Sequence, residues 1–345
     1  MKFKNKSKIT LNLKEPYENG LRWKIGINTV PCISVRKGKR CVYCGFINWE
    51  KPIEPQKVGG YFLDFFEKNY TKSISRVEVY SSGSFFDDCE VSANSRQEIV
   101  KTLNRDSIKE IVLETRPEFI NSKNIKDLTK YIDPKKLFIA VGLETMSDEI
   151  RRKTAKGFTK KRFIKAIDVL QKEGVGFQAY LLLKPPVDMS EYESIVDLAK
   201  SVKDLVCLMK NKPSSLVVAV QPFFVAENSF IAKIPYFRNE FKPIWLYSIA
   251  KSIEILDKIR KEQKYDFKII LGNYKDNVET ISVPSNYDES GKICTCSNKI
   301  RNYLNDINRH QKNVRIITDA VLAFKCDCKK SWIKEVGSKL QVKGF

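Results

Sequence analysis

The sequence predicts a mixed α/β protein built on a full or partial (β/α) barrel. Short apolar runs alternate with amphipathic helical patterns from Lys24 to about Gly272, an order typical of βαβ units and a parallel sheet. Six such units make a full or partial barrel, and a flat doubly wound sheet is the alternative. The six clear runs and a weaker seventh span residues 24–28, 76–80, 110–114, 137–143, 176–183, 215–221 and 267–271.

Helical patterns fill the intervals between these runs. Residues 95–104 are expected to form a helix with Ser95 as its N-cap, because Glu98 follows three residues later as in a capping box. Residues 160–173 place apolar side chains on one face and stop before Gly174. Residues 191–209 and 243–261 show similar patterns.

Composition divides the sequence into three parts. Residues 1–23 are expected to be a basic N-terminal extension, and residues 24–283 the barrel. Residues 284–345 hold two C-x-C pairs and carry 12 Lys and Arg against 6 Asp and Glu, a net charge of +6. This last part predicts a small cysteine-rich C-terminal module.

The protein as a whole has a net charge of +21, which favours a polyanionic partner such as a nucleic acid. A codon preference for Lys is the alternative explanation. The sequence contains neither an apolar run of eighteen residues nor the apolar core of a secretory signal, so a cytoplasmic protein without membrane contact is expected. In a reducing compartment the nine cysteines are considered first as metal ligands. Cys207, in an apolar stretch, is instead expected in the core.

Three cysteines follow the first predicted strand in the pattern Cys32-x8-Cys41-x2-Cys44. Functional sites of (β/α) barrels lie at the carboxyl ends of the strands, so these thiols are expected at the mouth of the barrel. A structural zinc or an ordinary [4Fe–4S] cluster uses four ligands, whereas three thiolates leave one iron open. A zinc site completed by a distant cysteine is the alternative.

Polar residues mark the ends of the other strands. The second run ends in a small turn, Ser81-Ser82-Gly83-Ser84. Candidates for the site at the later strand ends are Glu114, Arg116, Glu144, Lys184 and Gln221. Carboxylates at two strand ends are hard to explain by core packing. Ion pairs of Arg116 with Glu114 or Glu144 would be a purely structural explanation.

The cysteine motif resembles that of the radical S-adenosylmethionine (SAM) superfamily. There the usual spacing is C-x3-C-x2-C with an aromatic residue before the last cysteine, the place of Tyr43. The longer first gap is similar to that in relatives of the elongator catalytic subunit. The resemblance implies a [4Fe–4S] cluster on Cys32, Cys41 and Cys44, whose open iron binds SAM for one-electron cleavage. It also implies that the Gly-rich turn after the second strand meets SAM.

Further segments resemble the radical SAM subunit family of archaeosine synthase. They are residues 82–85 (SGSF), 114–119 (ETRPEF), 142–145 (GLET), 156–159 (KGFT) and 180–186 (YLLLKPP). The resemblance implies cleavage of a C–N bond in the lysine adduct of a 7-deazaguanine in tRNA, and a partner subunit that transfers the lysine. The residues expected to bind the cofactor are Tyr43, Ser82, Gly83, Ser84, Glu144 and Gln221. Those expected to act on the substrate are Glu114, Arg116 and Lys184.

The two C-terminal pairs, Cys294/Cys296 and Cys326/Cys328, match a structural four-cysteine zinc site. A second iron–sulfur cluster or free thiols are the alternatives. Aromatic and basic residues nearby, among them Trp332 and Tyr303, either form an RNA-binding surface or pack in the core.

Two other functions remain open at this stage. One is a different radical SAM enzyme of tRNA modification, either elongator-like or methylthiotransferase-like. The other is a non-enzymatic, zinc-bound RNA-binding protein, which would not bind SAM.

Overall fold

The computed structural model of the protein describes residues 8–46, 51–210, 214–272 and 278–342. Residues 1–7 of the expected extension and 343–345 of the expected C-terminal module lie outside these ranges. The main-sheet strands are β1 (Ile9–Tyr17), β2 (Gly20–Ile27), β3 (Ile74–Tyr80), β4 (Glu110–Glu114), β5 (Leu137–Glu144), β6 (Gly176–Leu183), β7 (Leu216–Pro222) and β9 (Lys268–Leu271). They form an eight-stranded sheet in that order. β1 pairs antiparallel with β2, and the other neighbours pair in parallel.

The sheet curls until its two edge strands meet at one end. The ammonium of Lys268, at the start of β9, lies 3.4 Å from the hydroxyl of Tyr17, at the end of β1, and 2.9 Å from Glu18. In a flat sheet, strands about 4.8 Å apart would separate the edges of eight strands by roughly 34 Å. The expected partial barrel is therefore confirmed, and the flat alternative is wrong.

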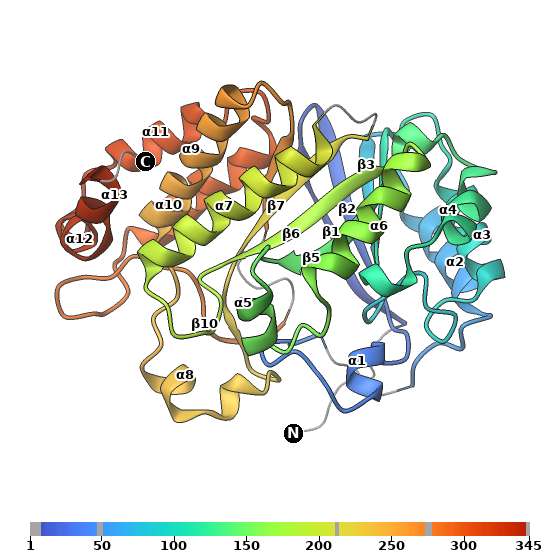
Figure 1. The fold of residues 1–345 in the computed structure, drawn as a ribbon, viewed down its shortest axis with the longest axis horizontal. Coiled ribbons are helices and arrows are strands. Elements are labelled where there is room, and N and C mark those ends of the chain that lie inside the picture. Colours follow the sequence, from blue (N-terminus) through green and yellow to red (C-terminus); the bar gives the residue numbers. More distant parts are fainter. Residues whose placement is uncertain (1–7, 47–50, 211–213, 273–277, 343–345) are drawn as a thin grey trace.

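Helices cover the outer face of the curled sheet (Figure 1). They are α2 (Val58–Asn69), α3 (Ala93–Leu103), α4 (Ser122–Thr129), α6 (Lys160–Lys172), α7 (Glu191–Met209) and α9 (Leu246–Glu262). Alternate residues of β2 and β3, such as Trp23, Ile25, Val77 and Val79, join the large core beneath these helices. Short helices lie at the carboxyl ends of the strands: α1 (Ile33–Arg36), α5 (Asp148–Lys153) and α8 (Pro235–Asn239). A two-stranded sheet of β8 (Val225–Ala226) and β10 (Thr280–Ser282) lies beyond β7.

The start of α3 differs from the expected N-cap at Ser95. Ser92 caps the helix instead, and its hydroxyl accepts the backbone N–H of Ser95 at 3.3 Å. The Ser95 hydroxyl donates to the carbonyl of Pro55 at 2.7 Å, a tertiary contact that local patterns do not reveal. α9 likewise begins at Leu246, three residues later than expected.

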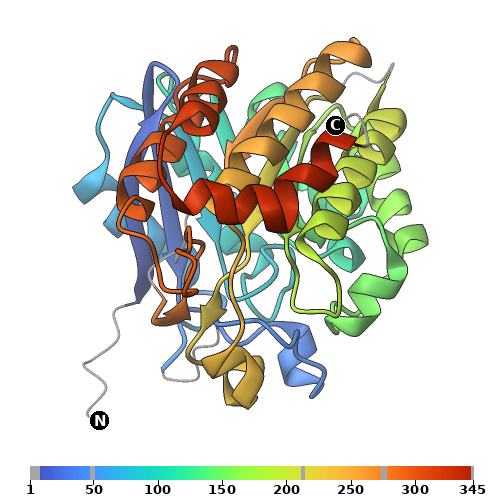
Figure 2. The same cartoon turned by 90° about the vertical axis from the view of Figure 1, so that its left-hand side faces the viewer.

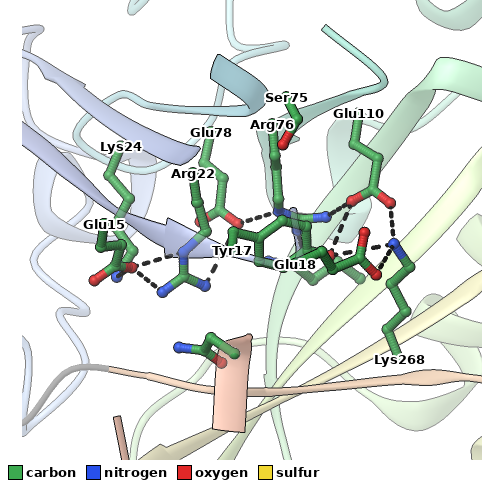
Figure 3. A network of polar contacts seen from close by, with 12 residues as sticks. Glu15, Tyr17, Glu18, Arg22, Lys24, Ser75, Arg76, Glu78, Glu110 and Lys268 are labelled. Carbon is green, nitrogen blue, oxygen red and sulfur yellow. Dashed lines mark hydrogen bonds and ion pairs between the residues drawn. The ribbon is translucent and has the colours of Figure 1, made fainter. Parts of the chain in front are cut away.

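The inner face of the barrel is polar at the amino ends of the parallel strands (Figure 3). Arg76 is fully buried and contacts Glu78 at 2.7 Å as well as Glu110, while Lys268 reaches Glu110 at 2.5 Å. Burial opposes the charge of Glu78, but the nearby cations Arg76, Arg22 and Lys24 together outweigh it and lower the pKa of this carboxyl to about 2. Paired in this way, the buried charges avoid most of the cost of desolvation.

Residues 9–23, expected in a separate N-terminal extension, form β1 and the start of β2 and so belong to the sheet. The side chains of β1 alternate between partly buried and exposed along the strand. This alternation lets the segment pair with β2 while the side chain of Lys14 stays exposed.

The C-terminal helices pack against the barrel and cross α9 (Figure 2). They are α10 (Ser297–Asn305), α11 (Arg315–Ala323), α12 (Cys328–Trp332) and α13 (Ser338–Val342). Trp332 is buried, donates to the Ser248 hydroxyl of α9 at 2.8 Å and contacts the ring of Tyr247. Tyr303 is partly exposed. Ile300, Val321 and Trp332 belong to the same hydrophobic core as the barrel helices.

Two further outcomes concern single features. Cys207 is exposed on α7, which corrects the expected core position, because it falls on the solvent side of this helix, as Lys200 and Lys203 do. Among the helices in the described ranges, none is long and apolar enough to cross a membrane.

Candidate active site and second metal site

The loop that carries the first three cysteines is held between two other segments. Cys32 is the N-cap of α1, and the backbone N–H of Cys44 donates to the carbonyl of Cys41 at 3.2 Å. Val42 donates to the carbonyl of Thr154 at 3.2 Å and accepts from the N–H of Ile231 at 3.1 Å. The cysteine loop is therefore fixed from both sides at the carboxyl end of the barrel strands.

The turn after β3 lies directly against the first cysteine. A Cβ built on Gly83 would lie 2.0 Å from the Cβ of Cys32, so this position requires glycine. Thr29 fixes the same turn, because the backbone N–H of Ser82 donates to its hydroxyl and the Ser82 hydroxyl donates to its carbonyl, both at 2.9 Å.

Glu90 holds the turn of residues 81–84 by hydrogen bonds to its carboxylate. Its carboxylate accepts from the Ser81 hydroxyl at 2.8 Å, the backbone N–H of Ser84 at 3.0 Å and the Thr29 hydroxyl at 3.3 Å. Burial raises the pKa of Glu90 to about 7, although the hydrogen bonds oppose this effect. The residues expected to meet SAM in this turn thus have a buried carboxyl group beneath them.

The three thiols lie close enough to influence one another electrostatically. Burial raises the pKa of Cys41, while the nearby charges of Lys156 and Arg116 lower it. Burial, followed by the charge of Cys41, raises the pKa of Cys44 to about 12. Both thiols would have to lose a proton before binding a metal.

Glu144 and Lys156 form an ion pair of 2.6 Å next to this loop. Glu144 ends β5 in a left-handed backbone conformation, with φ of +66°, which is rare for a residue other than glycine. Burial raises the pKa of Tyr43 well above its ordinary value, and the nearby Glu144 carboxylate contributes. The strand end thus brings Glu144 to the cysteine loop in a conformation that the surrounding contacts must maintain.

Glu114 ends β4 and points into the barrel. Burial raises its pKa to about 7; Lys156 opposes this, while the carboxylates of Glu144, Glu90 and Glu78 add to it. A carboxyl group with this pKa is present in both protonation states near neutral pH, as an acid or base catalyst requires.

Arg116 forms neither of the ion pairs weighed from the sequence. Its Nε donates to Glu118 at 2.5 Å, and one Nη donates to the carbonyl of Lys156 at 3.1 Å. Its backbone N–H donates to the Ser84 hydroxyl at 3.1 Å. Arg116 therefore connects three segments of the site.

Lys184 is held by partners outside the cysteine loop. Its ammonium binds Glu191 at 3.1 Å and the carbonyl of Lys242 at 2.7 Å, so its charge is already matched within the protein. Lys184 directly follows β6 and, like Glu144, has a positive φ, of +61°. Gln221, at the end of β7, lies so close to Gly272 that a Cβ there would be 1.9 Å from its Oε1.

Several buried polar atoms around the turn and the end of β4 are without hydrogen-bond partners within the described ranges. They are Oε1 of Glu90, Oγ1 of Thr115 and Oε2 of Glu118. Buried polar atoms are usually paired, so these are suited to a polar ligand. Together with three thiols on one fixed loop, they fit an iron–sulfur cluster with SAM.

The four C-terminal cysteines converge on one point. Their Sγ atoms all lie within 4.8 Å of one another, and those of Cys294–Cys326 and Cys296–Cys328 are 3.5 Å apart. A tetrahedral zinc with Zn–S bonds of about 2.3 Å places its sulfurs roughly 3.8 Å apart. A cubane cluster has four irons at separate corners and holds its thiolates farther apart than a single ion does.

Asn286 connects this cysteine site to the barrel. Its amide donates to Cys296 at 3.5 Å, and its oxygen accepts from the backbone N–H of Leu246 at 3.1 Å. The preceding N–H, of Trp245, donates to Glu191 at 3.3 Å. The first turn of α9 is thus capped both by the residue that supports the cysteine site and by the partner of Lys184.

Comparison with known proteins identifies the family. No family model matches the sequence. An uncharacterized protein of Methanocaldococcus jannaschii is 30% identical over 322 residues, which cover 89% of this chain and 79% of that protein. Proteins named archaeosine synthase subunit beta from Methanosarcina acetivorans and Thermococcus kodakarensis are 28% and 27% identical, over 75% and 71% of this chain and 78% and 73% of their own lengths. The protein belongs to one family with these three relatives, two of which are named archaeosine synthase subunit beta.

Two solved structures support the fold of this subunit beta relative. HydG, a maturase of the [FeFe]-hydrogenase, matches with a TM-score of 0.50 at 12% identity, over 94% of this chain and 82% of its own. Streptococcus suis SuiB matches with a TM-score of 0.51 at 12% identity, over 74% of this chain and 50% of its own, so the match spans half of SuiB. At this identity the likeness concerns the fold alone.

Two residues of the subunit beta site received no role from sequence reasoning. Lys156 lay in a motif without an assignment, and Glu90 was one of several loop carboxylates. The sequence signal for Lys156 is the following Gly157, which adopts φ of +79° and ends the loop after α5. For Glu90 the signal is weak, because neighbouring loop positions also carry carboxylates and one of its partners, Thr29, is distant in the sequence.

Proposed function

We propose that this subunit beta relative is a radical SAM enzyme that modifies tRNA. Family membership supports the class, and the geometry of the cysteine loop carries the proposal. Cys32, Cys41 and Cys44 lie on a clamped loop at the carboxyl ends of the strands, with the tight turn at Gly83 against the first of them. This is the end of the barrel where catalytic residues gather.

The three thiolates would hold a [4Fe–4S] cluster and leave one iron for SAM. When bound, the cluster and SAM supply an organic radical by one-electron cleavage of SAM. The protein's own residues position the cofactor. Thr29 and Glu90 hold the turn of residues 81–84, so that its backbone presents a fixed polar surface. Glu144 and Lys156 provide a charge pair beside the same loop.

Glu114 is suited to proton transfer during the reaction. The burial that raises its pKa to about 7 lets its carboxyl oxygen hold a proton at neutral pH and release it to a nearby base. A C–N bond cleavage produces an amine or imine that must gain or lose a proton. We assign this exchange to Glu114, with Arg116 and Glu118 keeping the end of β4 in place.

The proposed substrate is tRNA that carries a lysine-adducted 7-deazaguanine, and the proposed product is the formamidine of archaeosine. The net charge of +21 supports a polyanionic substrate. A separate subunit that transfers the lysine would supply the adduct. Lys184 is a weaker candidate for contact with it, because Glu191 already matches its charge.

We further propose that the four C-terminal cysteines bind one zinc ion. The Sγ separations of 3.5 Å fit a single tetrahedral ion better than the wider spacing of a cubane cluster. The amide of Asn286 lies against Cys296, as an outer hydrogen-bond donor would in a zinc–thiolate site.

Anaerobic reconstitution with iron and sulfide, followed by reduction, tests the function. The protein should cleave SAM to 5′-deoxyadenosine and convert lysine-adducted tRNA. Cys41→Ser should abolish both reactions, whereas Cys207→Ser, on an exposed surface of α7, should leave them unchanged. Conversion of a different tRNA base would favour another radical SAM enzyme. Absence of SAM cleavage in a zinc-loaded protein would favour an RNA-binding protein.

A further inference from the structure

Lys156 is enclosed within the barrel mouth although it carries a charge. Its side chain is 15% exposed and that of its partner Glu144 is 8% exposed. Gly142, two residues before Glu144 on β5, makes the space: a Cβ there would lie 2.5 Å from Nζ of Lys156 and 2.9 Å from Oε1 of Glu144. The ammonium therefore has one position, which the strand end defines.

The loop that carries Lys156 is attached to the cysteine loop. The carbonyl of Thr154 accepts from Val42, the residue after Cys41, at 3.2 Å. The carbonyl of Lys156 accepts from Arg116 at 3.1 Å. These contacts fix Lys156 relative to Cys41 through the backbone as well as through its side chain.

The charge of Lys156 reaches the cysteine loop, and at Cys41 it acts more strongly than any other charge that the structure describes there. After burial, it has the largest effect on Cys41, ahead of Arg116 and of the opposing Glu144. It also acts on Cys44. The other cation, Arg116, already pairs with Glu118 at 2.5 Å. In the ion pair of Lys156 and Glu144, the positive end thus dominates at Cys41.

We infer that Lys156 is a positioning residue whose ammonium sets the reduction potential of the cluster, and that Glu144 moderates this effect. The inference rests on the proposed cluster site and concerns one named cation next to it. A cluster with three thiolates is negative and becomes more so when it accepts an electron. A fixed buried cation stabilises the reduced form more than the oxidised form and so raises the potential.

The sign of the effect in three variants separates this role from a structural one. Lys156→Met keeps the length of the side chain and removes the positive charge, so the potential should fall. Glu144→Gln removes the opposing negative charge, so the potential should rise. The double variant, which removes both charges, should lie between the two single variants. If the variants only disturbed packing, the direction of the potential shift would not follow the sign of the charge that was removed.

The measurement is a redox titration followed by electron paramagnetic resonance, on reconstituted full-length protein without SAM. At the wild-type midpoint, Lys156→Met should show at least a tenfold lower ratio of reduced to oxidised cluster, a shift of about 59 mV for a one-electron couple. Lys153→Met, on the exposed side of the neighbouring helix α5, is the matched control and should not shift.

The outcomes distinguish the inferred role of Lys156 from the proposed function on which it rests. A wild-type protein without a cluster signal would overturn the proposed function itself. A normal wild-type cluster with unchanged potentials in Lys156→Met and Glu144→Gln would overturn only the role of Lys156. If Lys156→Met fails to hold a cluster, Glu144→Gln decides alone: a higher potential supports the inference, and an unchanged or lower one refutes it.

Discussion

Replacing Glu114 by Gln removes an ionisable group from the centre of the site while keeping the size of the side chain. Burial, together with the carboxylates of Glu144, Glu90 and Glu78, raises the pKa of Glu114 from 4.5 to about 7, and Lys156 only partly offsets this. The folded protein therefore binds this proton more tightly than the unfolded protein does. Because of this difference, the group makes the free energy of unfolding depend on pH.

The sign follows from the raised pKa. The stabilising effect of the protonated carboxyl is fully present below pH 4.5 and is lost as the pH rises through about 7. Each tenfold change in the acid dissociation constant corresponds to about 1.4 kcal/mol, so the rise from 4.5 to about 7 amounts to about 3 kcal/mol. The free energy of unfolding of Glu114→Gln, relative to that of wild type, should therefore increase by about 3 kcal/mol from pH 4.5 to pH 7.5 and change little at higher pH.

The assay is urea unfolding of the apoprotein under anaerobic conditions at several pH values, for wild type and Glu114→Gln. Glu262→Gln is the control, because Glu262 is exposed on α9 and, among the residues that the structure describes, forms an ion pair with Lys258 alone, at 3.9 Å. That control should show the same pH profile as wild type. A constant difference between Glu114→Gln and wild type from pH 5 to pH 8 would refute the reasoning, since Glu114 would then titrate alike in both states.

Three other predictions follow from single contacts. Gly83→Ala should prevent cluster assembly, measured as iron per protein molecule, because the new Cβ would lie 2.0 Å from the Cβ of Cys32. The control is Gly60→Ala, whose Cβ would meet open space and which should retain its full iron content. Cys326→Ser should contain no zinc by metal analysis. It should also lower the unfolding midpoint of the whole protein, because the C-terminal helices share the barrel core. Unfolding confined to residues 284–345 would contradict this prediction. Affinity for tRNA should fall as salt rises from low to physiological concentration, and a salt-independent affinity would assign the charge of +21 to codon preference.

Local periodicity in the sequence was enough to define most elements of the barrel. The predicted bounds of β4, β6 and α7 coincide with those observed, because each is a short apolar run or a long amphipathic pattern with a clear end. β1 was missed, although Ile9, Leu11 and Leu13 alternate with polar residues as in a strand. The Lys-rich sequence before and around this strand concealed the alternation.

The sequence by itself determined the residue types of the site and their order: three cysteines after the first parallel strand, a glycine in the next turn, and carboxylates at two later strand ends. Only the tertiary structure decided which of them meet. It paired Glu144 with Lys156 and Arg116 with Glu118, and it turned Lys184 toward Glu191. The reason is that each charged residue has several candidate partners of opposite charge along the sequence. The curl of the sheet and the left-handed strand ends select one partner by distance, which spacing in the sequence does not encode.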